Sequence, residues 1–154
     1  MSALGQKRTS MFQLVMLIHV SPAIRRYDME FAPVSKTKNQ EMPVPIAWRP
    51  ALKALADAIV GKRALRSIEG FVFRAIEDDG LEVSRSNIEA YPDKLGFLAE
   101  DSWKSSIYVW NEGFWEVLVD LTTEAGDLSD LVMHAKVTER EDGYFIEPGL
   151  IFVP

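Results

Sequence analysis

The chain has 154 residues, of which 47% are apolar and 26% charged, with no cysteine and two histidines. This composition is typical of a globular protein of one domain that buries a core without disulfides or metal ions. The lack of cysteine excludes disulfide scaffolds, thiol catalysis and cysteine-ligated zinc. No glycine-rich phosphate loop, serine nucleophile motif or metal-spaced histidine pair is present in the sequence, so we expect neither a cofactor nor a metal.

The net charge of −6 is unevenly distributed along the chain. Residues 1–50 carry seven basic and three acidic side chains, whereas residues 51–154 carry ten basic and twenty acidic ones. An acidic body repels nucleic-acid phosphates and anionic lipids and attracts basic proteins. We therefore expect no nucleic-acid and no membrane partner. The same charge is also what keeps a cytoplasmic protein soluble.

Residues 1–45 are predicted to form a basic, loosely ordered arm, and residues 46–154 a single domain. Residues 35–41 are polar and without period, and prolines punctuate the stretch that follows them. Residues 11–20 form an apolar run that is too short to span a bilayer. Because basic residues precede this run, a weak secretory signal is the alternative interpretation of the arm.

Three segments after the arm have helical spacing of apolar residues. Residues 50–60 begin with Pro50 and are followed by Gly61, as a helix start and stop require. Residues 65–76 also predict a helix, although Gly70 weakens it and residues 71–73 would suit a strand. Ser84 is the expected N-cap of a third helix, residues 84–91.

The C-terminal half changes to the period of two that is typical of strands. We expect four strands, residues 105–110, 114–123, 129–139 and 144–153, joined by short turns. Short connections predict that neighbours in sequence pair in the sheet. Pro148 and Gly149 indicate a bulge and an edge position for the last strand. The expected fold is therefore α+β, with two or three helices on one face of a curved four-stranded antiparallel meander.

Alternation assigns side chains to the two faces of this sheet. The face toward the helices is expected to carry Ile107, Val109, Trp115, Val117, Val119, Leu121, Leu131, Met133, Ala135 and Val137. The opposite face is expected to carry Tyr108, Trp110, Phe114, Glu116, Leu118, Asp120, Asp130, Val132, His134 and Lys136.

Glu116, Asp120 and His134 are the catalytic candidates, because alternation places them on one face of adjacent strands. There a carboxylate could orient the imidazole for proton transfer. The alternative is a solvated sheet face with one cross-strand ion pair of Lys136.

Four aromatic residues gather around the first predicted hairpin: Trp103, Trp110, Phe114 and Trp115. The alternation favours a core position for Trp115. Trp110, Phe114, Glu112 and Tyr108 are the binding candidates, because an aromatic anchor among acidic groups suits a basic partner.

The acidic residues 77–79, with Glu82, are expected at the end of the second helix, where they oppose its dipole. They lack the ligand spacing of a calcium loop, so a solvated loop is the preferred interpretation.

The stretch Asp101-Ser102-Trp103-Lys104-Ser105-Ser106-Ile107-Tyr108-Val109-Trp110, the stretch Gly113-Phe114-Trp115-Glu116-Val117-Leu118-Val119-Asp120-Leu121 and the ending Val153-Pro154 resemble a family of small uncharacterised bacterial domains. The resemblance covers residues 48–154 and implies a bacterial domain of unknown function. The order of helices and then a meander is also similar to the nuclear-transport-factor-2-like fold, which serves both enzymes and binding modules.

Three functions follow as expectations. The favoured one is a non-enzymatic, acidic, cytoplasmic binding module that docks a basic protein, as an immunity or antitoxin protein does. The alternative is a pocket protein that binds a small ligand or transfers a proton with Asp120 and His134. The third is a homodimer joined through the polar and aromatic sheet face.

Overall fold

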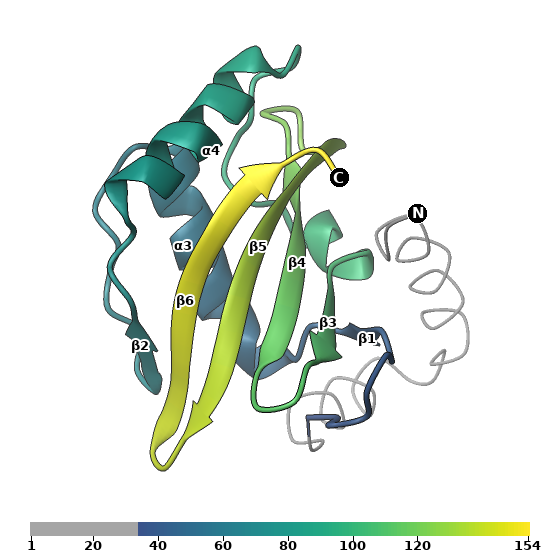
Figure 1. Ribbon diagram of the computed structural model, residues 1–154. Helices are drawn as coiled ribbons and strands as arrows, with labels where there is room; N and C mark the ends of the chain where they lie inside the picture. Colours follow the sequence, from purple (N-terminus) through teal and green to yellow (C-terminus); the bar gives the residue numbers. More distant parts are fainter. Residues whose placement is uncertain (1–33) are drawn as a thin grey trace.

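The computed structural model describes residues 34–154, so the predicted signal at residues 11–20 lies outside the described residues. The helices are α3 (Arg49–Val60) and α4 (Asp78–Ala90), and the short 3-10 helices are η1 (Ile46–Trp48) and η2 (Glu100–Lys104). The strands are β1 (Met42–Pro43), β2 (Phe71–Phe73), β3 (Ile107–Trp110), β4 (Trp115–Thr122), β5 (Leu128–Arg140) and β6 (Gly143–Phe152) (Figure 1).

Six strands form one mixed sheet in the order β1-β3-β4-β5-β6-β2. The four predicted strands are present as the antiparallel run β3 to β6, but the predicted four-stranded meander is wrong. β1 adds an antiparallel edge beside β3, and β2 adds a parallel edge beside β6. The sequence offered residues 71–73 only as an alternative strand and did not reveal β1, because strands of two and three residues carry too little alternation. The nuclear-transport-factor-2-like topology is not shown by this sheet order, because the sheet has a parallel edge strand that the predicted meander lacked.

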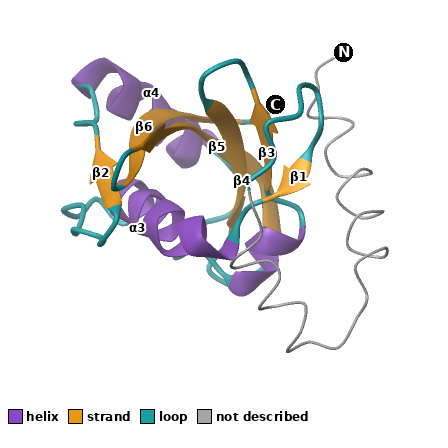
Figure 2. Cartoon of the chain, turned by 90° about the horizontal axis from the view of Figure 1, so that it is seen from below, coloured by secondary structure: helices purple, strands orange, loops and turns teal. Residues whose placement is uncertain are grey.

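α3 confirms the predicted helix at residues 50–60. Proline stands in its first turn, where a missing backbone N–H costs nothing, and Gly61 caps its end. The sheet curves around α3 (Figure 2), and Leu52, Leu55 and Ile59 are at most 2% exposed in the core between them. Because both elements bury apolar faces here, this layer holds the fold together.

The predicted helix at residues 65–76 is wrong. Gly70 has a φ of +84°, which ends any helix there, and the next three residues form β2. Val72 is 60% exposed while its two phenylalanine neighbours are partly buried, which is the alternation of a strand. Phe71 stacks on Tyr144 of β6 with ring centroids 5.6 Å apart. Tertiary pairing with β6 therefore makes residues 71–73 a strand and not part of a helix.

α4 begins at Asp78, six residues before the predicted N-cap Ser84. Asp78 and Asp79 thus lie in the first turn, where they favour the helix dipole, and not at the C-terminal end of a helix. Ser84 is 1% exposed and accepts a hydrogen bond from the Ile151 backbone N–H at 3.0 Å. Asn87 donates to the Ile151 carbonyl at 2.8 Å. α4 therefore covers the edge of β6 that β2 leaves unpaired.

The predicted bulge in the last strand is confirmed. Met133 pairs with Ile151 and Ala135 pairs with Pro148, so two β6 residues lie opposite His134 alone. A Cβ at Gly149 would lie 2.6 Å from His134 Nδ1, so glycine is required there. The predicted edge position of this strand is wrong, because β2 pairs beyond it.

Candidate functional site

The turn between β3 and β4 decides which side chains of the hairpin share a face. Glu112 and Gly113 have φ values of +43° and +114°, and Asn111 N–H donates to the Phe114 carbonyl at 2.8 Å. Such a two-residue loop pairs odd positions of one strand with even positions of the next. Trp110 therefore pairs with Trp115, and the two rings are 5.1 Å apart.

This register reverses the predicted faces of β3. Tyr108 pairs with Val117 on the helix-facing side, whereas Ile107 pairs with Leu118 on the opposite side. Tyr108 is only 3% exposed and lies 5.5 Å from the Trp48 ring. The predicted faces match odd positions of β3 with odd positions of β4, and a shift of one residue moves every side chain to the other face.

The buried aromatic core lies directly under this hairpin. Trp115 is 1% exposed, as predicted, and Trp103 is 5% exposed. The Trp48 ring lies 5.2 Å from Trp115 and 5.4 Å from Tyr144. Such tilted and edge-on pairs hold rings in fixed positions, so Trp110 is a half-buried aromatic on a rigid base.

Residues 35–38, which we call the lysine segment, lie across the end of the hairpin. Lys36 pairs with Glu139 at 2.9 Å, and Lys38 pairs with Glu112. The Lys36 ammonium also lies 5.5 Å from the Trp110 ring centroid, within reach of a cation–π interaction. Two carboxylates and an aromatic ring thus hold two lysines of the same chain.

Ser35 anchors the lysine segment through its backbone. Its N–H donates to the Tyr108 hydroxyl at 2.7 Å, and its carbonyl accepts from Trp115 Nε1 at 2.9 Å. Burial raises the pKa of Tyr108, and the hydrogen bond from Ser35 partly offsets this effect. These two bonds to largely buried groups contrast with the exposed lysine contacts that follow them.

We call Trp110, Glu112 and Glu139 the hairpin-end surface. Two of the four predicted binding residues belong to it. Tyr108 lies beneath it, and Phe114 is on the other face of the sheet, where the Lys136 ammonium sits 4.8 Å from its ring. Glu139 was missed because it lies two strands away from Trp110, and no local pattern connects them.

The register places Glu116, Asp120 and His134 on one face of β4 and β5, as the alternation predicts. Asp120 is fully buried and its carboxylate accepts a hydrogen bond from Ser105 Oγ. Its backbone N–H donates to Ser106 Oγ at 2.9 Å. The residue directly opposite His134 is Leu118, not Glu116 or Asp120. The described contacts of Asp120 are those of a structural carboxylate that ties the start of β3 to β4.

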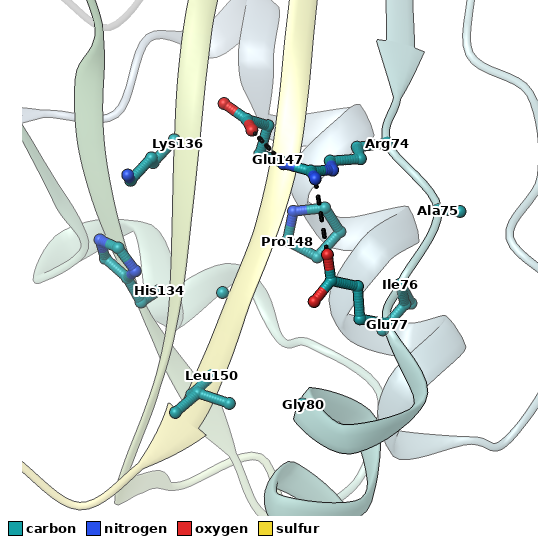
Figure 3. Close-up of a pocket in the computed structure, with 11 residues that line it drawn as sticks. Arg74, Ala75, Ile76, Glu77, Gly80, His134, Lys136, Glu147, Pro148 and Leu150 are labelled. Carbon is teal, nitrogen blue, oxygen red and sulfur yellow. Dashed lines mark hydrogen bonds and ion pairs between the residues drawn. The ribbon is translucent and has the colours of Figure 1, made fainter.

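His134 instead lines a pocket of about 300 Å³, the His134 pocket, on the outer side of β5 and β6 (Figure 3). Lys136 lies beside it on β5, and neither Asp120 nor Glu116 lines the pocket. On the far side, Arg74 bridges Glu147 at 2.9 Å and Glu77 at 3.5 Å. The pocket therefore combines an imidazole and an ammonium with an ion-paired wall.

Burial lowers the pKa of His134. Glu116 acts in the opposite direction by attracting the protonated form, and Lys136 lowers the pKa further by repulsion. The imidazole is therefore neutral near pH 7 and able to accept a hydrogen bond or a proton.

Two observations concern metals and membranes. Among residues 34–154 the structure brings together no group of three His, Asp or Glu side chains that could hold a metal ion. Within that same part of the chain, no helix combines the length and the apolar character needed to cross a membrane.

The fold and these surfaces define a small α+β domain with one aromatic and acidic surface and one polar pocket. Residues 58–154 match the family model described as a domain of unknown function, DUF7668. This match covers well over half of the chain, so the chain belongs to this family. No curated protein and no solved structure shows significant similarity to the chain.

Proposed function

We propose that this domain is a non-enzymatic binding module that docks a basic segment of a partner protein on the hairpin-end surface. The observation that carries the proposal is the lysine segment, whose two ammonium groups already lie on the carboxylates of Glu139 and Glu112. The chain thus displays the recognition chemistry on one of its own segments. A lysine- or arginine-bearing loop of a partner would take the place of Lys36 and Lys38.

The two lysine contacts are weak enough to be exchanged. The side chains of the Lys36–Glu139 pair are 53% and 56% exposed, and those of the Lys38–Glu112 pair are 58% and 71% exposed. Exposed ion pairs contribute only about 0–1 kcal/mol to stability. A partner that adds contacts around such pairs can therefore displace the lysines while Ser35 stays anchored.

The charge of the body supports a basic partner. Residues 51–154 carry ten acidic side chains in excess over basic ones, and such a field accelerates the encounter with a positively charged protein. An immunity or antitoxin protein that neutralises a basic toxin in a bacterial cytoplasm is the role that this chemistry suits.

The test uses a hexapeptide with the sequence of residues 35–40, blocked at both ends, as a probe of full-length protein. Tryptophan fluorescence reports binding, because Trp110 lies at the surface that binds the peptide. We expect the Lys36→Gln, Lys38→Gln variant to bind the peptide more tightly than the wild type does, because its carboxylates are vacant. Added Glu112→Gln and Glu139→Gln changes should abolish binding.

Glu124→Gln is the matched control, since Glu124 follows the other end of β4 and pairs with Lys94 at 3.1 Å. It should leave peptide affinity unchanged. The proposal fails if the lysine-free variant binds no better than the wild type does, or if the control weakens binding as much as the two hairpin changes. A rise in molecular mass of the lysine-free variant in size-exclusion chromatography would instead identify a second copy of the chain as the partner.

A second candidate is the binding of a small carboxylate in the His134 pocket. It is favoured by the position of Lys136, which has no ion pair with another described residue and lies next to the neutral imidazole. A titration with acetate and succinate, followed by the His134 ring signals in NMR spectra, tests it. If the ring signals stay unchanged up to the highest ligand concentration, with the ionic strength held constant, this candidate is excluded.

A further inference from the structure

A second pocket, of about 520 Å³, lies beside the C-terminal half of α3 and shares no lining residue with the His134 pocket. We call it the Arg66 pocket, and it is independent of the hairpin-end surface. Its lining consists of Lys53, Ala54, Asp57, Arg63, Ala64, Arg66 and Phe97. Three cations and one carboxylate line it, although the chain as a whole carries a net charge of −6.

The single carboxylate is already engaged in holding the wall of the pocket. Asp57 is 5% exposed, and its carboxylate accepts from the Leu98 backbone N–H at 2.8 Å and from Lys53 Nζ at 2.7 Å. Lys53 also donates to the Leu98 carbonyl at 3.0 Å. This clamp fixes the segment around Leu98 against α3, so the charges of Lys53 and Asp57 largely cancel.

The two arginines are left with their charges unneutralised by any described neighbour. The Arg63 guanidinium lies 4.3 Å from the centroid of the Phe97 ring, a stacking distance. Arg66 makes no ion pair or hydrogen bond with its side chain to any of residues 34–154, and it is exposed. Its guanidinium, with five donors, is the group that best fits a carboxylate or phosphate.

Phe97 supplies a flat apolar surface beside these charges. It is 54% exposed, so the ring is accessible to a ligand in the pocket. A Cβ at Gly61 would lie 3.0 Å from the Phe97 ring, so the glycine lets the ring approach the end of α3. The ring is therefore held in place at the pocket and not simply exposed at a loop tip.

We propose that the Arg66 pocket binds a small molecule that carries a phosphate or carboxylate group on a flat ring. The oxyanion lies between Arg63 and Arg66, and the ring of the ligand packs on Phe97 and the two alanines. Two cations around one anion supply the affinity, and the apolar wall selects against small inorganic ions.

The test measures binding of three probes to the full-length protein by isothermal titration calorimetry: phenyl phosphate, benzoate and inorganic phosphate. We expect phenyl phosphate or benzoate to bind in the millimolar range or tighter, and inorganic phosphate to bind at least about tenfold more weakly because it lacks the ring. The stronger of the two aryl probes shows whether the site prefers phosphate or carboxylate.

Arg66→Gln should weaken the better probe by about tenfold, the effect of one charged hydrogen bond. Because Arg66 has no described partner, this variant keeps the folded structure, which its unfolding midpoint verifies. Lys94→Gln removes the same charge elsewhere and should not change the affinity. Equal affinities in the two variants, or equal binding of inorganic phosphate and the aryl probes, would overturn the proposal.

Discussion

Replacement of Gly143 by alanine tests the parallel edge of the sheet, which is the part of the fold that the sequence did not predict. Gly143 has a φ of +152°, and a Cβ there would lie 2.0 Å from the Gly70 carbonyl oxygen. That oxygen accepts the hydrogen bond from the Tyr144 backbone N–H at 2.8 Å. The methyl group therefore cannot fit without separating β2 from β6.

The expected cost follows from two contributions. A backbone conformation reserved for glycine costs about 1–3 kcal/mol in another residue, and loss of one backbone hydrogen bond adds about 1 kcal/mol. Together they lower the free energy of unfolding by roughly 3 kcal/mol, and at about 2–4 °C per kcal/mol the unfolding midpoint falls by roughly 10 °C. Circular dichroism during thermal unfolding and urea titration measures both quantities.

Gly126→Ala is the matched control. Its φ is +88°, but no neighbouring atom lies within 4 Å of the position that a Cβ would occupy, so only the conformational cost of about 1–2 kcal/mol applies. If Gly143→Ala is no more destabilising than Gly126→Ala, the close approach of Gly70 and Gly143 is wrong, and with it the β2–β6 pairing.

Three further predictions concern buried polar groups. Burial lowers the pKa of His134, so the folded state resists protonation of this imidazole. The protein therefore loses stability as the pH falls below about 6.5, the ordinary pKa of histidine. Between about pH 7.5 and about pH 5.5, the unfolding temperature of His134→Gln should fall less than that of the wild type. Asp57→Ala should lower the free energy of unfolding by about 2–4 kcal/mol, because a buried backbone N–H loses its acceptor and the Lys53 ammonium loses one of its two acceptors. A urea titration that finds less than about 1 kcal/mol contradicts this role. Ser84→Ala should lower the free energy of unfolding by about 1–3 kcal/mol, since it leaves the Ile151 backbone N–H of β6 without its acceptor. Ser86→Ala on the same helix should change the free energy of unfolding little. Equal losses in the two variants would exclude the edge-covering role of α4.

The parts of the fold that the sequence predicted are those with long, regular patterns. α3 and the strands from β3 to β6 have enough apolar positions for the period to be unambiguous. β2 was assigned to a helix because Leu65, Ile68 and Val72 mimic a helical stripe. Residues 71–73 also suited a strand, and their pairing with β6 decides between the two. The pairing of this three-residue strand with a partner distant in sequence leaves no signal in local spacing.

In the candidate sites too, the sequence predicts what depends on local pattern and misses what depends on long-range pairing. The sequence places Glu112 and Trp110 close together because the hairpin is local, but it joins Tyr108 and Phe114 to them by assuming a register that differs from the observed one. A change of one residue in the length of the turn would move each side chain to the other face. The two-residue turn that is present depends on positive φ at Glu112 and Gly113. His134 was chosen for its chemistry, but its pocket is formed by a bulge and by a segment distant in sequence.

The most direct test of the central claim is a map of where a lysine-bearing segment binds. ¹H–¹⁵N NMR spectra of the Lys36→Gln, Lys38→Gln protein, titrated with the hexapeptide of residues 35–40, follow every backbone amide and the indole of Trp110. We predict that the signals of Trp110, Glu112 and Glu139 shift together and saturate, while that of Glu124 stays in place. Saturating shifts confined to other parts of the sheet, or none at all, would contradict the assignment of the hairpin-end surface as the docking site.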